Sequence, residues 1–164
     1  MRFPLDSHID LASIPAPNRW GARRKFDVHT GVDLFAPEGT RVYACEDGEV
    51  VDVCTFTGAS IGMPWWNETM CVSVKGASGV ILYGEITPAV ENGQMVKEGD
   101  LIGTIKQVLI KDKGRPMSML HIEWYEGDYK GKGFEKNVWE AWELDGKKPS
   151  KLKNVEKLIF NGTE

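Results

Sequence analysis

A histidine and an aspartate stand four residues apart in the stretch 28–34 (VHTGVDL), as His29 and Asp33. On a helix this spacing would place both side chains on one face, but the valines and the glycine favour strand or loop. In a straight strand, residues four apart lie roughly 13 Å from each other, whereas the ligand atoms of a shared metal lie about 2 Å from its centre. The chain must therefore bend, and Gly31 can adopt unusual backbone angles at little cost. We predict that His29, in a loop, and Asp33, at a strand start, form half of a metal site.

A second histidine lies in an apolar segment far along the chain. Residues 117–125 are predicted to form a strand, whose two-residue period places Met119, His121 and Glu123 on one face. From spacing alone the simpler interpretations stay open. An isolated His-x3-Asp is more often a pair of unrelated turn residues, and a lone strand histidine is more often an ordinary core residue.

The composition is that of an ordinary globular protein. The 164 residues are 41% hydrophobic and 27% charged, which suits one domain with a real hydrophobic core. The formal net charge of −4 gives no case for binding nucleic acid or an anionic membrane surface. No apolar run approaches the roughly 18 residues that a membrane-spanning helix needs, so we expect no membrane span. Nothing in the sequence indicates an oligomeric state.

The cysteine count bears on location. Cys45, Cys54 and Cys71 form no Cys-x-x-Cys pair. An odd number fits a reducing compartment, in which thiols act as small core residues, and the spacing does not suit a zinc–thiolate cluster. Residues 1–6 lack the apolar segment of a secretion signal. These features favour a cytoplasmic location, while export by another route and a missing leader stay open.

Turn residues divide most of the chain into short strands. The predicted strands cover residues 40–45, 49–54, 70–75, 80–83 and 117–125, with a strand–turn–strand unit at 96–103. Asp47-Gly48 predicts a hairpin between the first two strands, and the loop 58–67 carries Trp65 and Trp66. Many short strands separated by regular turns indicate an all-β antiparallel sandwich or barrel.

The two ends of the chain differ from this pattern. Residues 1–18 contain three prolines and few periodic apolar positions, which predicts an extended arm laid over the domain. Residues 131–164 form a C-terminal extension of the same single domain. Within it, Leu152, Val155 and Ile159 have helical spacing. We predict one short helix over residues 150–160, with Ser150 as its N-cap.

An ordered set of motifs over residues 19–125 resembles the lysostaphin-type (LytM-like) zinc metallopeptidases, which are peptidoglycan endopeptidases. The motifs are residues 19–23 (RWGAR), 29–34 (HTGVDL), 36–40 (APEGT), 47–50 (DGEV), 96–103 (VKEGDLIG) and 120–123 (LHIE). The resemblance implies an antiparallel β sandwich of the duplicated hybrid motif (barrel-sandwich) type. It also implies a zinc ion held by His29, Asp33 and His121, below a cleft for a peptide or peptidoglycan-like ligand. Two imidazoles, a carboxylate and an open position suit hydrolysis.

Two positions depart from the family pattern. Its Tyr-x-His-Leu segment reads Tyr83-Gly84-Glu85-Ile86 here, and Met119 replaces the first histidine of its His-x-His pair. In the family these two histidines handle protons and stabilise the oxyanion. Met119 can do neither, whereas Glu85 can serve as a general base or be a solvated strand residue. Losing one oxyanion donor typically costs roughly 100- to 1000-fold in rate.

The ligand cleft of this resemblance lies among the loops over the metal. Trp65 and Trp66 cannot both point into a strand-like core, so we expect at least one to be exposed beside the cleft as an apolar wall. Burial of both as a lid on the core is the alternative. Tyr83 and Met119 are further candidates for ligand contact.

Two functions are compatible with these residues. The first is a zinc-binding metallopeptidase-fold domain with weak or absent hydrolysis that acts as a binding module. The alternative is an active zinc metalloendopeptidase that cleaves peptidoglycan cross-bridges or glycine-rich peptides with Glu85 as general base. A lipoyl- or biotinyl-like carrier shares the pattern of residues 96–100, but it needs a lysine at a hairpin tip, and the Asp47-Gly48 turn has none.

Overall fold

The structure is a computed structural model that describes residues 1–109, 118–127 and 142–160. In these ranges all strand pairs are antiparallel. The strands are β1 (Val32–Phe35), β2 (Arg41–Tyr43), β3 (Gly48–Thr57), β4 (Thr69–Gly76), β5 (Gly79–Pro88), β6 (Met95–Val96), β7 (Leu101–Ile105), β8 (Met119–Tyr125) and β9 (Leu152–Lys153). The helical elements are the α-helix α2 (Val155–Ile159) and the 3-10 helices η1 (Leu11–Ser13), η2 (Ala16–Asn18) and η3 (Ala59–Ile61).

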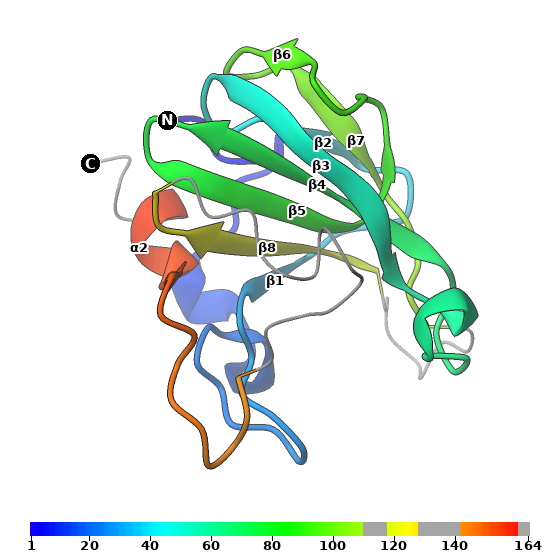
Figure 1. Ribbon diagram of the computed structural model, residues 1–164, viewed down its shortest axis with the longest axis vertical. Helices are drawn as coiled ribbons and strands as arrows, with labels where there is room; N and C mark the ends of the chain where they lie inside the picture. Colours follow the sequence, from blue (N-terminus) through cyan, green and yellow to red (C-terminus); the bar gives the residue numbers. More distant parts are fainter. Residues whose placement is uncertain (110–117, 128–141, 161–164) are drawn as a thin grey trace.

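Two layers of strands enclose the core (Figure 1). The larger layer contains β1, β8, β5, β4 and β3, in this order. β2 pairs with β7, and β7 joins the larger layer at the end of β5, where Ile86 is paired with Ile105. The predicted all-β antiparallel sandwich with one short helix is confirmed. None of the helices in the described ranges has the length and apolar character needed to cross a membrane.

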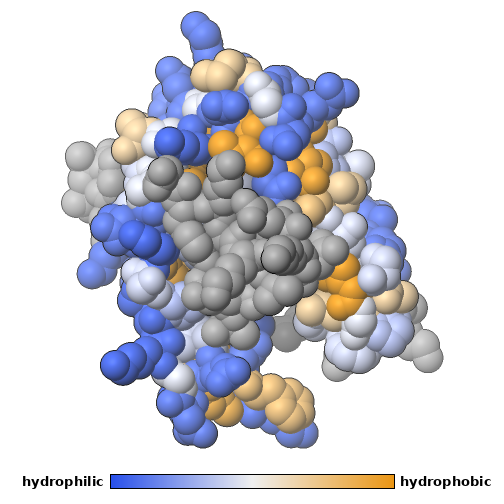
Figure 2. Space-filling model, in the orientation of Figure 1, coloured by the Kyte–Doolittle hydropathy of each residue, from blue (hydrophilic) through white to orange (hydrophobic). Residues whose placement is uncertain are grey.

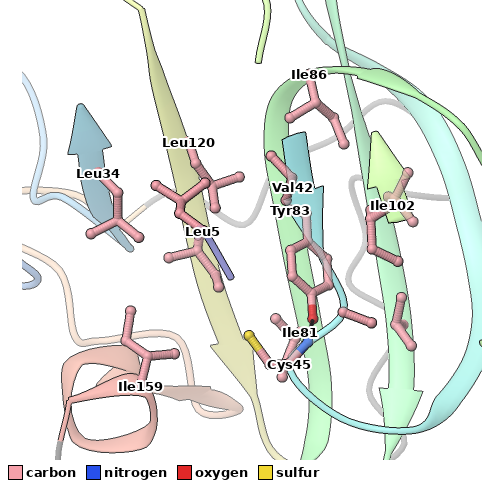
Figure 3. Close-up of a cluster of buried hydrophobic side chains, with 14 of the residues drawn as sticks. Leu5, Leu34, Val42, Cys45, Ile81, Tyr83, Ile86, Ile102, Leu120 and Ile159 are labelled. Atoms are coloured by element: carbon pink, nitrogen blue, oxygen red, sulfur yellow. Dashed lines mark hydrogen bonds between the residues drawn. The ribbon is translucent and has the colours of Figure 1, made fainter. Parts of the chain in front are cut away.

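Alternation along β5 and β8 separates the core from the site. Tyr83 and Leu120 are fully buried, and Figure 3 shows them in one cluster with Val42 of β2 and Ile102 of β7. Because neighbouring residues of a strand point to opposite faces, the flanking residues of β8 face away from this cluster. His121 therefore lies on the outer face of the larger layer.

The predicted hairpin across Asp47-Gly48 is wrong, because β2 and β3 are not partners: β3 pairs with β4 and β6. Gly48 is the first residue of β3, opposite Gly76 and Val96. The Asp47 carboxylate accepts a hydrogen bond from the backbone N–H of Glu98 at 2.7 Å. The Asp47 side chain, which would stabilise a tight hairpin turn, thus holds the turn before β7 instead. The Asp-Gly pair connects β2, which pairs with β7, to β3, which pairs with β4 and β6.

The N-terminal arm is only partly extended. It contains η1 and η2, and it buries Leu5 and Ile14 in the main core cluster. The backbone N–H of Arg2 donates to the carbonyl of Cys45 at 2.9 Å. These contacts attach residues 1–14 to the sandwich along their length.

The C-terminal helix is shorter than predicted, and its N-cap is not Ser150. The side chain of Asn154 caps α2 by accepting a hydrogen bond from the backbone N–H of Glu156 at 3.0 Å. Residues 152 and 153 form β9 instead, and Leu152 is paired with Tyr125 of β8. Residues 131–141 and 161–164 of the expected extension lie outside the described residues, as does residue 117 of the strand expected at 117–125.

Candidate metal centre

Three donor atoms from β1, β8 and the loop before β1 converge on one point. Nδ1 of His121 lies 2.9 Å from Oδ1 of Asp33. Nε2 of His29 lies 3.3 Å from Nδ1 of His121 and 3.4 Å from Oδ1 of Asp33. All three side chains are buried. The structure thus brings together the three residues that the sequence proposes as ligands.

These separations suit a tetrahedral metal. Zinc–ligand bonds of about 2.05 Å in a tetrahedron place neighbouring ligand atoms roughly 3.3 Å apart, close to the three distances above. Two imidazole nitrogens and one carboxylate oxygen are also the donor types of hydrolytic zinc sites. The residues present therefore fit a zinc ion with a fourth position open.

Strand register and one glycine produce this convergence. Asp33 of β1 lies directly opposite His121 of β8. Gly31, between His29 and Asp33, does not adopt a positive φ, so the bend does not depend on a left-handed backbone conformation at this residue. A Cβ at this position would lie 2.3 Å from the carbonyl oxygen of Ile122 and 2.9 Å from Nε2 of His121. Gly31 is needed because the loop packs directly against β8.

Outer hydrogen bonds fix which ring nitrogen of each histidine faces the metal position. Nδ1 of His29 lies 3.0 Å from the carbonyl oxygen of Arg19, which can only accept, so Nε2 keeps its lone pair. Nε2 of His121 lies 2.6 Å from a carboxylate oxygen of Glu123, which leaves Nδ1 toward the metal position. Glu123 is itself held by Thr30, at 2.8 Å, and by the hydroxyl of Tyr125. Such outer partners orient metal ligands in proteins.

The second oxygen of Asp33 is also paired. Oδ2 accepts a hydrogen bond from the side-chain amide of Asn18 at 2.9 Å and another from Arg24 at 3.3 Å. Burial acts to raise the pKa of Asp33, but the hydrogen bond from His121 and the close approach of the His29 ring outweigh burial and hold the pKa well below its ordinary value. The carboxyl group of Asp33 is thus ionised throughout the physiological range, as a metal ligand must be.

The His121 ring lies between two carboxylates. Burial acts to lower its pKa, but the hydrogen bonds to Asp33 and Glu123 outweigh burial and raise the pKa to about 10. Without a metal, the ring therefore carries a proton on each nitrogen at neutral pH. A metal ion held by Nδ1 would take the place of the proton on that nitrogen, and the Nε2–H of His121 would keep its hydrogen bond to Glu123.

A cavity of about 420 Å³ opens over the three donor atoms. Its walls are mainly apolar, and its polar groups are those of the site and its margin. The described lining residues of the walls are Val28, Phe56, Met63, Trp66, Val108, Leu109, Met119 and Trp142. In the view of Figure 2 the described surface is mostly hydrophilic. A mostly apolar hollow with a few convergent polar groups is typical of a ligand site.

The four residues proposed for ligand contact have different positions. Met119 and Trp66 line the cavity. Trp65 is 61% exposed and is not a lining residue. Tyr83 is fully buried in the core, and its hydroxyl accepts a hydrogen bond from the backbone N–H of Cys45 at 2.9 Å. Tyr83 lies on the opposite face of β5 and is not a ligand contact, which corrects the sequence interpretation.

Glu85 lines the cavity because the strand is irregular at this point. The β4–β5 register shifts between the pairs Cys71–Gly84 and Met70–Ile86, which leaves Glu85 as an extra residue, and its φ is +64°. Such bulges re-aim side chains and occur beside functional sites. Oε2 of Glu85 is buried without a hydrogen-bond partner among the described residues. Burial, and then the charge of Asp33, raise the pKa of Glu85 to about 8.

Several residues of the site had no role in the sequence interpretation. The two-residue period puts Glu123 on the same face of β8 as His121, which is the signal from which their contact could be found, but no role for Glu123 follows from the sequence interpretation. Asn18 and Arg24 lie in segments without any periodic pattern. Phe56, whose ring centroid lies 5.4 Å from that of His121, follows a register shift in β3. Only the folded chain brings these three residues to the site.

Comparison with known proteins identifies the family. The model of peptidase family M23 matches residues 27–133, well over half of the chain. The chain belongs to peptidase family M23. No match was found among the curated proteins.

Solved structures show the same fold. The catalytic domain of lysostaphin from Staphylococcus simulans matches with a TM-score of 0.54 at 16% identity, over 88% of this chain and 89% of that domain. The protein cbpa from L. salivarius REN matches with a TM-score of 0.52 at 19% identity, over 94% and 88% of the two chains. A longer lysostaphin structure matches with a TM-score of 0.51 at 17% identity, over 82% of this chain. The chain spans only 44% of the length of that protein.

Proposed function

We propose that this M23 domain binds one zinc ion through His29, Asp33 and His121 and holds a peptide or peptidoglycan-like ligand in the cavity over it, with weak or no hydrolysis. One observation carries the proposal. The three-ligand set is complete and supported by outer hydrogen bonds, whereas Glu85 and Met119 occupy the two cavity positions at which the family resemblance has histidines.

A bound zinc ion would supply Lewis acidity, which polarises a peptide carbonyl and lowers the pKa of a water molecule. The residues of the chain must then move protons and stabilise charge. Hydrolysis places negative charge on the former carbonyl oxygen. The thioether of Met119 has no hydrogen to donate to this oxygen. Losing one hydrogen-bond donor costs about 3–4 kcal/mol of transition-state stabilisation. We therefore expect the domain to bind its peptide ligand but to hydrolyse it weakly or not at all.

The apolar lining supports a peptide ligand. Phe56, Met63, Trp66 and Met119 offer surface for side chains or for the flat faces of a peptide backbone. Peptides and peptidoglycan are also the ligands that membership of the family favours. The cytoplasmic location expected from the cysteine count stays a prediction.

An active peptidase is the alternative, and one feature favours it. The Glu85 carboxylate lines the same cavity as the three donor atoms and has an oxygen without a partner among the described residues. A carboxylate in this position can accept a proton from water.

Metal binding is tested by elemental analysis of purified protein after zinc loading and dialysis. We expect one zinc per chain in the unmodified protein. His121→Ala should lose the metal, because a three-ligand site cannot spare one ligand. His8→Ala is the matched control, since His8 lies in the N-terminal arm with its side chain 60% exposed. Equal zinc content in His121→Ala and His8→Ala would refute the site.

Turnover is tested with zinc-loaded protein on peptidoglycan and on glycine-rich peptides. We expect little or no cleavage by the unmodified protein, retained binding of the peptides, and a gain of activity in the double variant Glu85→His, Met119→His. Robust cleavage that Glu85→Ala abolishes would instead establish the active enzyme with Glu85 as its base.

A further inference from the structure

Two cysteines face each other across neighbouring strands beside the site. Cys54 of β3 and Cys71 of β4 are register partners, and their Sγ atoms lie 3.3 Å apart. Both pack in a small apolar cluster with Phe56 and Leu82, separate from the main core. Phe56 is the residue whose ring lies against His121. The thiol pair therefore packs with Phe56, a residue that lines the cavity.

The geometry suits a disulfide. Directly opposed residues of antiparallel strands have Cα atoms about 4.5 or 5.5 Å apart, and both values lie within the range that a disulfide spans. The sulfur atoms would have to close from 3.3 Å to about 2.05 Å. A rotation of the two side chains can supply this movement without a change in strand pairing.

The two thiols differ in access. Cys54 is partly exposed, whereas Cys71 is fully buried. A solution reagent can therefore reach the sulfur of Cys54 first. The hydrogen bond with Cys54 and burial raise the pKa of Cys71 well above its ordinary value, which makes Cys71 the slower nucleophile. Its position next to Cys54 offsets part of this disadvantage, since the second attack is intramolecular.

We propose that Cys54 and Cys71 form a reversible dithiol–disulfide pair that small-molecule disulfides of the glutathione type oxidise. In the first step the Cys54 thiolate attacks one sulfur of oxidised glutathione, and one glutathione leaves with the electron pair of the broken S–S bond. In the second step the Cys71 thiolate attacks Sγ of Cys54, and the second glutathione leaves. The two thiol protons end on the two glutathione molecules, so the chain loses two electrons and oxidised glutathione gains them.

The bond would act on the cavity through the loop between β3 and β4. β3 ends at Thr57 and β4 begins at Thr69, so the pair lies near the base of this loop. Met63 and Trp66 of the loop line the cavity. A disulfide here would link β3 and β4 covalently at the base of the loop. It would restrict the movement of the part of the cavity wall that Met63 and Trp66 form.

The test is oxidation of the full chain with oxidised glutathione, followed by mass spectrometry. Cleavage after Glu49 and Glu68 places Cys45, Cys54 and Cys71 in three different peptides. We expect a disulfide between the peptides 50–68 and 69–85, reversed by dithiothreitol, and faster closure at higher pH because more thiolate is present. The oxidised chain should also unfold at a higher urea concentration than the reduced chain.

Three variants separate the possible outcomes. Cys45→Ala should behave as the unmodified chain, because Cys45 is fully buried and burial raises its pKa to about 12. Cys71→Ala should retain one glutathione on Cys54, and Cys54→Ser should show no shift of the urea midpoint on oxidation. A glutathione adduct that persists on Cys54 in the unmodified chain would overturn the proposal. A bond that includes Cys45, or a bond between two chains in place of the internal one, would also overturn it.

Discussion

The carboxylate of Glu123 controls the orientation of the His121 ring. It lies 2.6 Å from Nε2 of His121 and is only 1% exposed. Hydrogen bonds from Thr30 and Tyr125 hold it in place. The chain of contacts from Tyr125 to Glu123 to His121 fixes the tautomer in which Nδ1 is the ligand atom.

Replacement of Glu123 by glutamine should therefore weaken zinc binding. The amide keeps the size of the side chain but is a weaker acceptor and no longer increases the basicity of His121. We expect a roughly 10- to 100-fold loss of zinc affinity, measured by competition with a chromogenic chelator. Glu126→Gln, at an exposed position at the end of β8, is the control. If both variants bind zinc equally well, Glu123 has no such role.

Glu85 should give the metal-free protein a distinct pH dependence. Its pKa of about 8 in the folded chain exceeds the ordinary value of about 4.3 in the unfolded chain. Between these values the folded state holds a proton that the unfolded state has lost, so the contribution of this group to stability falls as pH rises and is constant above about 8. The charge is buried without a hydrogen-bond partner for Oε2 among the described residues.

In chelator-treated protein, Glu85→Gln should therefore raise the melting temperature relative to the unmodified chain. The gain should be small near pH 4.5, grow up to about pH 8 and then stay level. Differential scanning calorimetry over this range measures it. A gain that is constant with pH would show that the carboxyl group titrates normally.

Strand periodicity and the family resemblance predicted much of the fold, and the three residues proposed as ligands lie together in the structure. The two-residue period correctly put His121 and Glu123 on one face, and β1 carries Asp33 to the same place. Departures from regular geometry could not be predicted. The bulge at Glu85 and the position of Phe56 follow register shifts that no local pattern encodes. The hairpin prediction at Asp47-Gly48 was wrong, and the Asp47 carboxylate accepts a hydrogen bond from the backbone N–H of Glu98, far along the chain.

Gly31 shows how closely the loop before β1 must approach β8. Gly31→Ala forces a Cβ against the carbonyl oxygen of Ile122 at 2.3 Å, and this backbone atom cannot rotate away. We expect a loss of about 3 kcal/mol in unfolding free energy together with loss of zinc binding, measured by urea titration and chelator competition.

Gly39→Ala is the informative comparison. Gly39 has φ +90° and nothing within 4 Å of an added Cβ. Gly39→Ala should lower the unfolding free energy by about 1 kcal/mol through backbone strain alone, and its zinc affinity should be normal. If Gly31→Ala behaves like Gly39→Ala, close packing is not the reason for Gly31.

Helix α2 contacts residues 19 and 20, which precede the loop that carries His29, the first proposed metal ligand. Glu156 of α2 is buried and accepts hydrogen bonds from Nε and a terminal nitrogen of Arg19 at 2.9 and 3.0 Å. It also accepts the backbone N–H of Trp20 at 2.7 Å. The carbonyl oxygen of Arg19 is the partner of Nδ1 of His29. The helix α2 thereby positions the segment that orients the ring of His29, and Figure 1 shows α2 beside the N-terminal segment.

Glu156→Gln tests this connection, because the amide keeps the shape of the side chain but loses the charge that Arg19 and Trp20 share. Arg19 is partly exposed, so we expect a loss of about 2 kcal/mol in unfolding free energy rather than the about 3–5 kcal/mol of a fully buried pair. Zinc affinity should fall as well, because the Arg19 carbonyl no longer holds His29 in one orientation. Lys157→Gln, at the exposed neighbouring position, should change neither quantity. Loss of stability in Glu156→Gln with unchanged zinc affinity would show that α2 supports the fold alone and does not reach the site.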